Sequence, residues 1–196
     1  MLSAYVAVLS VLCLGANPEL VKKSIAANVL IDVGPSWCSG VVIKNNIVVT
    51  AAHCYNKDMK VIVDKTYRVL YARKHETKDI MVLLIDGMIK DTAPITLKEQ
   101  MPGQDIYIIG NIPDGDYIMV DMVTPGIVSK KWKKDYAVSA DIIKGMSGGG
   151  AYTDAGELFC IIVTGFPIQG LSVGSKGRCV NISHAVEMTM PPEKSK

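Results

Sequence analysis

From residue 28 onward, the chain alternates short apolar runs with turn residues. The runs are rich in Val, Ile and Tyr, and Gly, Pro, Asn and Asp separate them. This texture is typical of β-strands joined by tight turns. The predicted strands are 28–33, 40–43, 47–50, 59–63, 66–72, 80–85, 105–110, 117–124, 126–129, 136–140, 149–152, 158–164 and 178–181.

Two short helices flank these strands. One is predicted over 17–27, with Pro18 in its first turn, where proline is tolerated. The other is predicted over 183–188. Many short strands and few helices indicate an all-β sandwich or barrel. The turn at 112–115 is a seam that divides the chain into two compact halves, residues 17–112 and 113–196.

The first sixteen residues form a long apolar run that ends in the small residues Gly15 and Ala16. The run is shorter than the ~20 residues that a membrane-spanning helix needs, so no stable membrane span is predicted. Small residues at the end of an apolar core are typical of a secretory leader, although no Lys or Arg precedes this core. Residues 1–16 are therefore either a leader, which predicts a secreted or periplasmic protein, or a buried or interfacial helix.

Composition narrows the classes of function. Of 196 residues, 49% are hydrophobic and 20% charged, and 21 Lys and Arg stand against 19 Asp and Glu. These values exclude a disordered segment and give no sign of a charge-driven nucleic-acid partner. The one dense charge run, Lys130–Lys134 around Trp132, is read as a solvated hairpin loop in preference to a surface for phosphate or anionic lipid.

The chain has five cysteines. Removal of the leader takes away Cys13 and leaves Cys38, Cys54, Cys160 and Cys179. An even number is compatible with two disulfides in three connectivities, which agrees with an oxidising compartment. Four free buried thiols in a reducing compartment are the alternative.

Three segments carry candidate chemistry: 50–54 (TAAHC), 78–84 (KDIMVLL) and 145–150 (GMSGGG). They supply His53, Asp79 and Ser147. A serine hydroxyl needs an imidazole to take its proton and a carboxylate to orient that imidazole. A tight glycine-rich turn lets the backbone N–H groups of Gly145 and Ser147 point at one spot, as a developing oxyanion requires.

Competing residues are less favoured for these roles. Asp79 alone opens an apolar strand, whereas Asp58, Asp64 and Asp86 do not. His75 and His184 are read as structural. The scattered histidines, the missing CxxC and HExxH motifs and the missing phosphate-loop ending predict no metal and no cofactor.

The segments 38–43 (CSGVVI) and 50–54 resemble the chymotrypsin-like, or trypsin-fold, serine peptidases. The segments 104–113 (QDIYIIGNIP), 124–129 (TPGIVS) and 141–161 are closest in texture to the compact Deg-type branch, and we expect no appended peptide-binding domain. The resemblance implies two six-stranded antiparallel barrels in residues 17–112 and 113–196, packed side by side. It also implies a bridge between Cys38 and Cys54.

The function implied by the resemblance is a hydrolase, a serine endopeptidase that acts on protein or peptide substrates. Its catalytic residues are His53, Asp79 and Ser147, and the oxyanion is bound by Gly145 and Ser147. Met146 departs from the family, because trypsins keep there an Asp that pairs with a freed N-terminus. Two alternatives remain: an inactive binding protein with this fold, and a viral or phage polyprotein-processing protease. The oligomeric state stays open.

The sequence leaves open both the substrate preference and the state of the second cysteine pair. Asp141 lies six positions before Ser147, where trypsins place the carboxylate that binds Lys or Arg substrates, and Val163, Thr164 and Gly165 are expected in the pocket wall. A basic preference therefore competes with a small aliphatic one and with an aromatic one. Cys160 and Cys179 fall on neighbouring predicted strands, either bridged or as two buried thiols.

Overall fold

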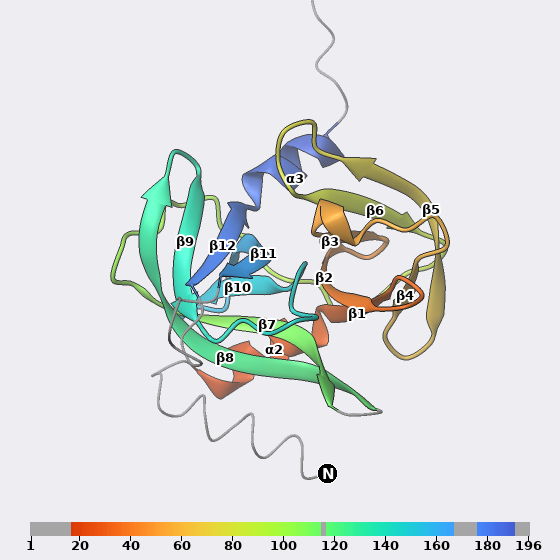
Figure 1. The fold of residues 1–196 in the computed structure, drawn as a ribbon, viewed down its shortest axis with the longest axis horizontal. Coiled ribbons are helices and arrows are strands. Elements are labelled where there is room, and N and C mark those ends of the chain that lie inside the picture. The colour runs from red at the N-terminus through yellow and green to blue at the C-terminus, as the bar shows by residue number, and fades with distance from the viewer. Residues whose placement is uncertain (1–16, 115–116, 167–175, 191–196) are drawn as a thin grey trace, which may run out of the picture.

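A computed structural model of the chain describes residues 17–114, 117–166 and 176–190, and its strands form two closed barrels that lie side by side (Figure 1). At 113, 114, 117–120, 164–166 and 176 the description covers the backbone alone. Each barrel has six strands, and neighbouring strands are antiparallel. The predicted architecture of two six-stranded antiparallel barrels is confirmed.

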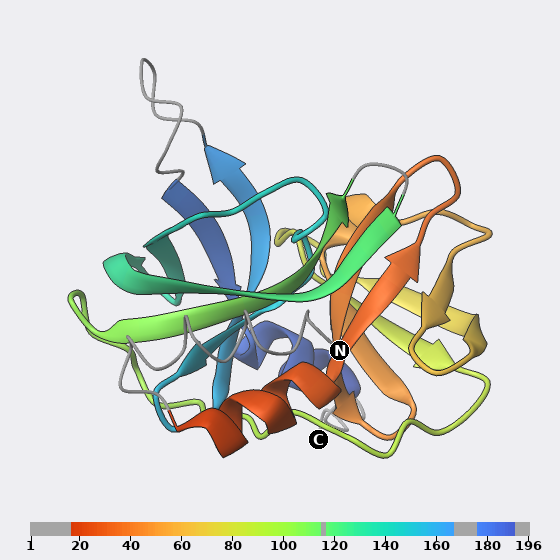
Figure 2. The ribbon, with the colours of Figure 1, turned by 90° about the horizontal axis from the view of Figure 1, so that it is seen from below.

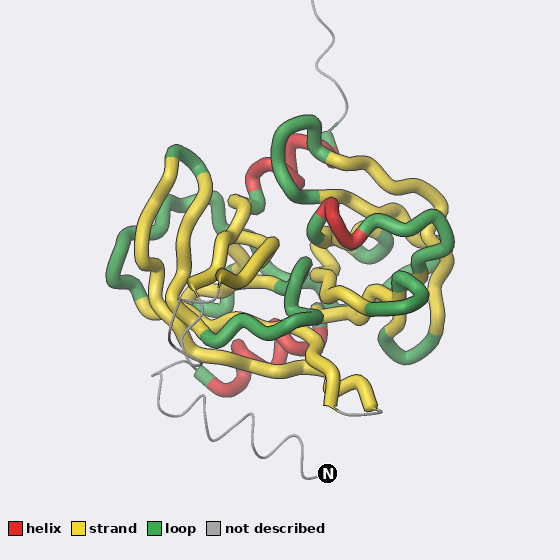
Figure 3. Tube along the Cα trace, in the orientation of Figure 1, coloured by secondary structure: helices red, strands yellow, loops and turns green. Residues whose placement is uncertain are grey.

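The first barrel has the strand order β1-β2-β3-β6-β5-β4 and the second has β10-β11-β12-β9-β8-β7. The strands of the first barrel are β1 Asn28–Asp32, β2 Trp37–Lys44, β3 Ile47–Thr50, β4 Lys60–Ile62, β5 Thr66–Lys74 and β6 Met81–Ile85. Those of the second are β7 Asp105–Asp114, β8 Tyr117–Trp132, β9 Asp135–Ala140, β10 Gly150–Thr153, β11 Leu158–Phe166 and β12 Lys176–Asn181. Loops join most of these strands, as Figure 3 shows.

The boundary between the barrels differs from the predicted one. β7 begins at Asp105 and belongs to the second barrel, so the change of barrel falls within 86–104 and not at 112–113. Residues 112–114 of the turn signal are instead the end of β7, which pairs with β8 as a hairpin as far as Asp114 and Tyr117. Pro, Asp and Gly mark a hairpin turn as readily as a seam between two halves.

β8 is one strand where the sequence predicts two. The prediction interrupts it at Pro125, because proline has no amide hydrogen for a strand ladder. In the structure Pro125 pairs with Tyr107 of β7, and the pairing of β8 with β9 begins only at Gly126. Pro125 therefore stands where β8 has a single neighbour, a position that tolerates proline.

The two predicted helices are confirmed. α2 (Pro18–Ala26) begins after Asn17, whose side chain accepts a hydrogen bond of 2.9 Å from the amide of Glu19. Figure 2 shows α2 packed along the second barrel before the chain enters β1, and Ser24 Oγ lies 3.0 Å from Tyr107 Oη. α3 is Ser183–Thr189. In the described ranges, no helix has the length and apolar character needed to cross a membrane.

Apolar packing is continuous across the two barrels. One buried cluster contains Val29 and Leu83 of the first barrel together with Tyr107 and Ile161 of the second. A further cluster, which includes Phe159, fills the second barrel alone. Each strand presents branched or aromatic side chains to one of these clusters. The loops that carry His53, Asp79 and Ser147 therefore start from a rigid base.

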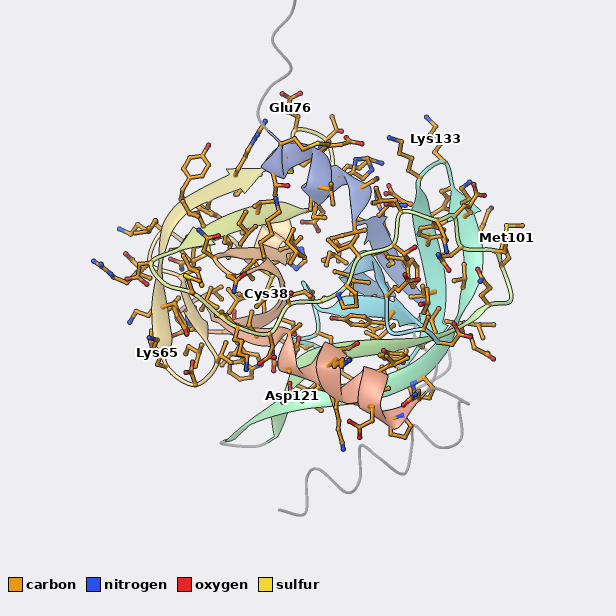
Figure 4. All side chains as sticks on the ribbon, turned by 180° about the vertical axis from the view of Figure 1, so that it is seen from behind. Cys38, Lys65, Glu76, Met101, Asp121 and Lys133 are labelled. Carbon is orange, nitrogen blue, oxygen red and sulfur yellow. A yellow bond between two sulfur atoms is a disulfide. The ribbon has the colours of Figure 1, made fainter. Side chains whose placement is uncertain are left out.

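Each barrel contains one disulfide. Cys38–Cys54 joins β2 to the turn after β3, with a Cα–Cα distance of 6.2 Å, which confirms the expected bridge. Cys160–Cys179 joins β11 to β12 over 5.6 Å, so the second pair is bridged as well. Figure 4 shows Cys38 near the centre of the molecule, whereas Lys133 lies at its periphery. Two disulfides are typical of a protein that folds in an oxidising compartment.

Candidate active site

His53 lies on a short 3₁₀ helix, η1 (Ala52–Cys54), directly after β3. The following residue, Cys54, is buried and bridged to β2 through Cys38. The amide of Cys54 also donates a hydrogen bond of 3.2 Å to the Ala51 carbonyl. The backbone on either side of His53 is thus held, while the imidazole side chain itself is 47% exposed.

Asp79 holds His53 through two hydrogen bonds, one to the ring and one to the backbone amide. It lies in the loop before β6, next to the buried Ile80. His53 Nδ1 lies 2.7 Å from Asp79 Oδ2, and the amide of His53 donates to Oδ1 over 2.8 Å. Burial alone would raise the pKa of Asp79, but the side-chain and backbone hydrogen bonds from His53 hold the pKa below its ordinary value. Asp79 therefore remains a carboxylate, and it leaves Nε2 of the imidazole free to act as a base.

Ser147 lies in the loop between β9 and β10, where glycines set the backbone path. Gly145 has φ +102° and Gly148 φ +88°, in the left-handed region that favours glycine. A Cβ on Gly145 would lie 2.6 Å from the carbonyl oxygen of Asn111. Among the residues that the structure describes, the N–H groups of Gly145 and Ser147 donate no hydrogen bond. Two unpaired N–H groups on one turn can bind an oxyanion.

The three candidate catalytic residues meet at one open pocket of about 500 Å³. Its lining consists of His53, Asp79, Ile142, Ile143, Lys144, Ser147 and Val163. The first barrel supplies His53 and Asp79, and the second supplies the other residues. The described contacts include no hydrogen bond between the Ser147 hydroxyl and the His53 ring; such bonds are often long before substrate binds.

The residues expected to bind substrate occupy different places. Val163 is buried at 2% exposure and lines the pocket. Asp141 is exposed and is not among the lining residues, which differs from the buried pocket floor expected from its offset. Thr164 and Gly165 continue β11, paired with Arg178 and Gly177, and their side-chain positions lie outside the described residues.

Sequence reasoning missed an ion pair between the barrels beside Asp79. Lys78 Nζ lies 2.5 Å from Asp135 Oδ2 at the start of β9, and the Asp135 side chain is only 5% exposed. Asp135 also accepts a hydrogen bond of 3.3 Å from the Asn181 amide and lies 3.5 Å from His184 Nε2. Lys78 precedes Asp79, so this pair ties the loop of the carboxylate to the second barrel. The partners are 57 positions apart, and no local pattern indicates such a pair.

One grouping of potential metal ligands occurs in the described part of the chain: Cys38, His53 and Cys54. Its two sulfur atoms are joined in a disulfide. Metal ligation by cysteine requires a free thiolate, so this grouping is not available to a metal. The expectation of a site without metal or cofactor stays a prediction.

Comparison with known protein families identifies the family of this chain. The sequence profile of the Trypsin-like peptidase domain matches residues 38–161. The chain belongs to this family. The match begins at the first bridged cysteine and includes the three segments that meet at the pocket, so the protein is a trypsin-like peptidase. No curated protein is a significant match.

Solved structures similar to this peptidase share its fold. An inactive mutant of Rv3671c from M. tuberculosis H37Rv has a TM-score of 0.71 at 16% identity, over 90% of this chain and 94% of that one. The serine endoprotease from Yersinia pestis has a TM-score of 0.73 at 22% identity, over 86% of this chain and 63% of that one. Kallikrein-related peptidase 10, in complex with Zn²⁺, has a TM-score of 0.69 at 18% identity, over 85% and 94%. The fold expected from the sequence is that of these proteases.

Proposed function

We propose that this peptidase is a serine endopeptidase that works through an acyl-enzyme. Ser147 Oγ attacks the carbonyl carbon of a peptide bond while His53 Nε2 takes the hydroxyl proton. The N–H groups of Gly145 and Ser147 bind the oxyanion. His53 then gives its proton to the leaving amine, and a water molecule, activated by the same imidazole, hydrolyses the acyl-enzyme.

The observation that carries this proposal is the double hydrogen bond from His53 to Asp79 at the mouth of the Ser147 pocket. The contact at Nδ1, 2.7 Å, orients the ring, and the contact at the backbone amide, 2.8 Å, fixes where the ring leaves the chain. A carboxylate that binds both groups of one histidine supports a general base with a defined tautomer. The pocket lining also includes the nucleophile candidate.

Labelling with a fluorophosphonate probe tests the proposal. We expect one covalent adduct, on Ser147, and cleavage of a casein-type substrate. Ser147→Ala should fold normally, lose the adduct and reduce kcat by ~10⁴-fold or more, whereas Ser36→Ala, outside the pocket lining, should behave as wild type. A folded wild type that neither labels nor cleaves would favour an inactive binding protein.

We further propose that the peptidase prefers an aliphatic residue on the acyl side of the cleaved bond. Ile142, Ile143 and Val163 give the pocket an apolar wall, and the carboxylate of Asp141 is exposed outside that lining. An apolar wall binds a branched aliphatic side chain and provides no partner for a buried cation. We expect faster cleavage after Val than after Arg or Phe in matched peptides. Arg preference in the wild type, lost in Asp141→Ser, would instead identify Asp141 as the specificity residue.

An extracytoplasmic location is the remaining part of the proposed function. The two disulfides support it, and the expected leader at residues 1–16 lies outside the described residues. Expression of the full chain with a bacterial secretion host should yield oxidised protein outside the cytoplasm that begins near residue 17. Protein that keeps Met1 in the cytoplasm with four free thiols would contradict this location.

A further inference from the structure

Ser39 occupies a junction between the barrels at which every polar group of the residue is used. It lies on β2 of the first barrel, with no exposed surface. Its hydroxyl donates to the Gly145 carbonyl over 2.8 Å and accepts from the Asn111 amide over 2.7 Å. Its own amide donates to the Ser147 carbonyl over 2.7 Å, and its carbonyl accepts from Thr50 Oγ1 over 2.7 Å.

Gly145 and Ser147, the two candidate oxyanion-binding residues, are anchored through their carbonyl groups, whereas the amides of Met146 and Gly148 between and after them donate to the carbonyls of Ile143 and Ile162. The N–H groups of Gly145 and Ser147 must stay unpaired in order to bind an oxyanion, and within the described residues they do. Gly145 has no side chain, and its φ of +102° belongs to a residue with wide conformational freedom. For these two residues, the carbonyl oxygens are therefore the backbone groups that remain for anchoring, and Ser39 binds both of them.

The hydrogen-bond directions at Ser39 are determined by its surroundings. The Asn111 amide always donates, so it occupies a lone pair of Ser39 Oγ and leaves the single hydroxyl hydrogen for the Gly145 carbonyl. Asn111 is itself held by a hydrogen bond of 2.9 Å from Nδ2 to the Val29 carbonyl. Ser39 also follows Cys38, whose bridge to Cys54 clamps the backbone beside His53.

We propose that Ser39 is a positioning residue for the oxyanion-binding turn. Its hydroxyl fixes the Gly145–Met146 peptide plane, and its amide fixes the Ser147–Gly148 plane. Each of these planes is joined through the Cα atom of Gly145 or Ser147 to the plane that carries that residue's own N–H group, so Ser39 limits the directions in which the two N–H groups can point. This inference rests on the proposed function. The sequence around Ser39 gives no sign of this positioning role, which depends on contacts with residues far away in the chain.

Ser39→Ala tests the proposal, and Ser24→Ala provides a matched control. Both serines are fully buried. Ser24 is not among the residues that line the pocket. Its Oγ lies 3.0 Å from Tyr107 Oη and donates over 3.1 Å to the Leu20 carbonyl. Loss of an oxyanion donor reduces kcat by ~10²–10³-fold, so an indirect change in donor placement should reduce kcat by ~10–10²-fold. KM should change by less than about threefold, because ground-state binding does not use the oxyanion geometry.

Two further measurements separate positioning from general destabilisation. The inhibition constant of a peptide aldehyde, which forms an oxyanion on the serine, should rise in parallel with the loss of kcat. Ser39→Thr keeps the hydroxyl and should recover most of kcat. Ser39→Cys fills a similar volume with a weaker donor, so its kcat should fall between those of wild type and Ser39→Ala, and it serves as the main variant if Ser39→Ala does not fold.

The outcomes separate this proposal from the proposed function. A wild type that cleaves no peptide and takes no fluorophosphonate label contradicts the proposed function itself. An active wild type with a folded Ser39→Ala or Ser39→Cys whose kcat and aldehyde affinity match those of Ser24→Ala would overturn the role of Ser39 alone. A loss confined to KM would overturn it too.

Discussion

The two disulfides close loops of nearly equal length but should differ in their effect on catalysis. Cys38–Cys54 spans 16 residues and Cys160–Cys179 spans 19, each within one barrel. We expect the double variants Cys38→Ala/Cys54→Ala and Cys160→Ala/Cys179→Ala to lose similar stability. Only the first should lose kcat.

The size of the stability loss follows from the loop lengths. In the chain-entropy description, a bridge that closes a loop of 16 or 19 residues lowers the entropy of the unfolded chain by an amount worth about 3 kcal/mol in either case. For a chain of this size, that loss corresponds to a fall in Tm of roughly 6–12 °C. All four cysteines are buried, at 7% exposure or less, so the packing lost in the two double variants is comparable.

The effect on kcat should differ because of position. Cys54 follows His53, and Cys38 precedes Ser39, whose amide donates to the Ser147 carbonyl, so the first bridge joins the two backbone segments beside His53 and Ser147. The second bridge connects two paired strands, β11 and β12, that their own ladder already aligns. At a temperature where both variants are folded, we expect kcat to fall by about tenfold or more for the first and by less than about twofold for the second.

Thermal unfolding and steady-state kinetics under non-reducing conditions check both parts. Unequal stability losses, with one variant near wild type, would refute the loop-entropy argument. Equal kcat values in the two folded variants would refute the clamp on His53, whatever the stabilities.

Three further predictions concern single residues. Gly148→Ala should lower the free energy of unfolding by about 3 kcal/mol or more in chemical denaturation, because a Cβ there would overlap a backbone carbonyl. Gly103→Ala, where φ is +92° but the space around the Cβ is open, should lower it by only about 1–2 kcal/mol. Equal losses in the two variants would contradict the overlap. Asp79→Asn should reduce kcat by ~10⁴-fold with Tm nearly unchanged, because the imidazole adopts the wrong tautomer; a loss below about tenfold would remove Asp79 from the proposed triad. Burial lowers the pKa of His184 in the folded protein. Its contribution to stability is therefore complete above the unfolded-state pKa of ~6.5 and is lost as pH falls below that pKa. His184→Gln should flatten the fall in the free energy of unfolding between about pH 7 and pH 5, and an unchanged dependence of that free energy on pH would refute this.

Local patterns predict most of the strands and mark the three segments that meet at the pocket, whereas the catalytic roles of His53, Asp79 and Ser147 are implied by the family resemblance. The strand at 80–85 and the turn at 145–150 are marked by composition over a few residues, so Asp79 and Ser147 can be located without the fold. The disulfide at Cys38 could be expected only through the family resemblance. The sequence predicts two strands in place of β8, because the effect of Pro125 depends on how many strands pair with β8 at that point, and this is known only from the barrel.

The residues that line the pocket could not be predicted from their offsets along the chain. Counting back from Ser147 locates Asp141 along the chain, but the direction of its side chain depends on the path of the loop from β9 to Gly145. In the structure Ile142, one position later, lines the pocket, and its side chain packs against the backbone of Gly177 on β12. An offset of one residue therefore exchanges a carboxylate for an aliphatic wall.

Directional contacts are what a reaction centre divided between two barrels requires. The apolar core is continuous across the barrel interface, and apolar packing gives affinity between surfaces without specifying their relative position to a fraction of an ångström. Hydrogen bonds and ion pairs do specify it, because they weaken steeply with distance and angle. The structure has such contacts on both sides of the pocket: Ser39 binds the carbonyl of Gly145 in the proposed oxyanion turn, and Lys78 binds Asp135 beside the loop of Asp79. A largely buried ion pair adds little net stability compared with apolar packing, so we expect the Lys78–Asp135 pair to act mainly by fixing the position of the loop of Asp79 relative to the second barrel.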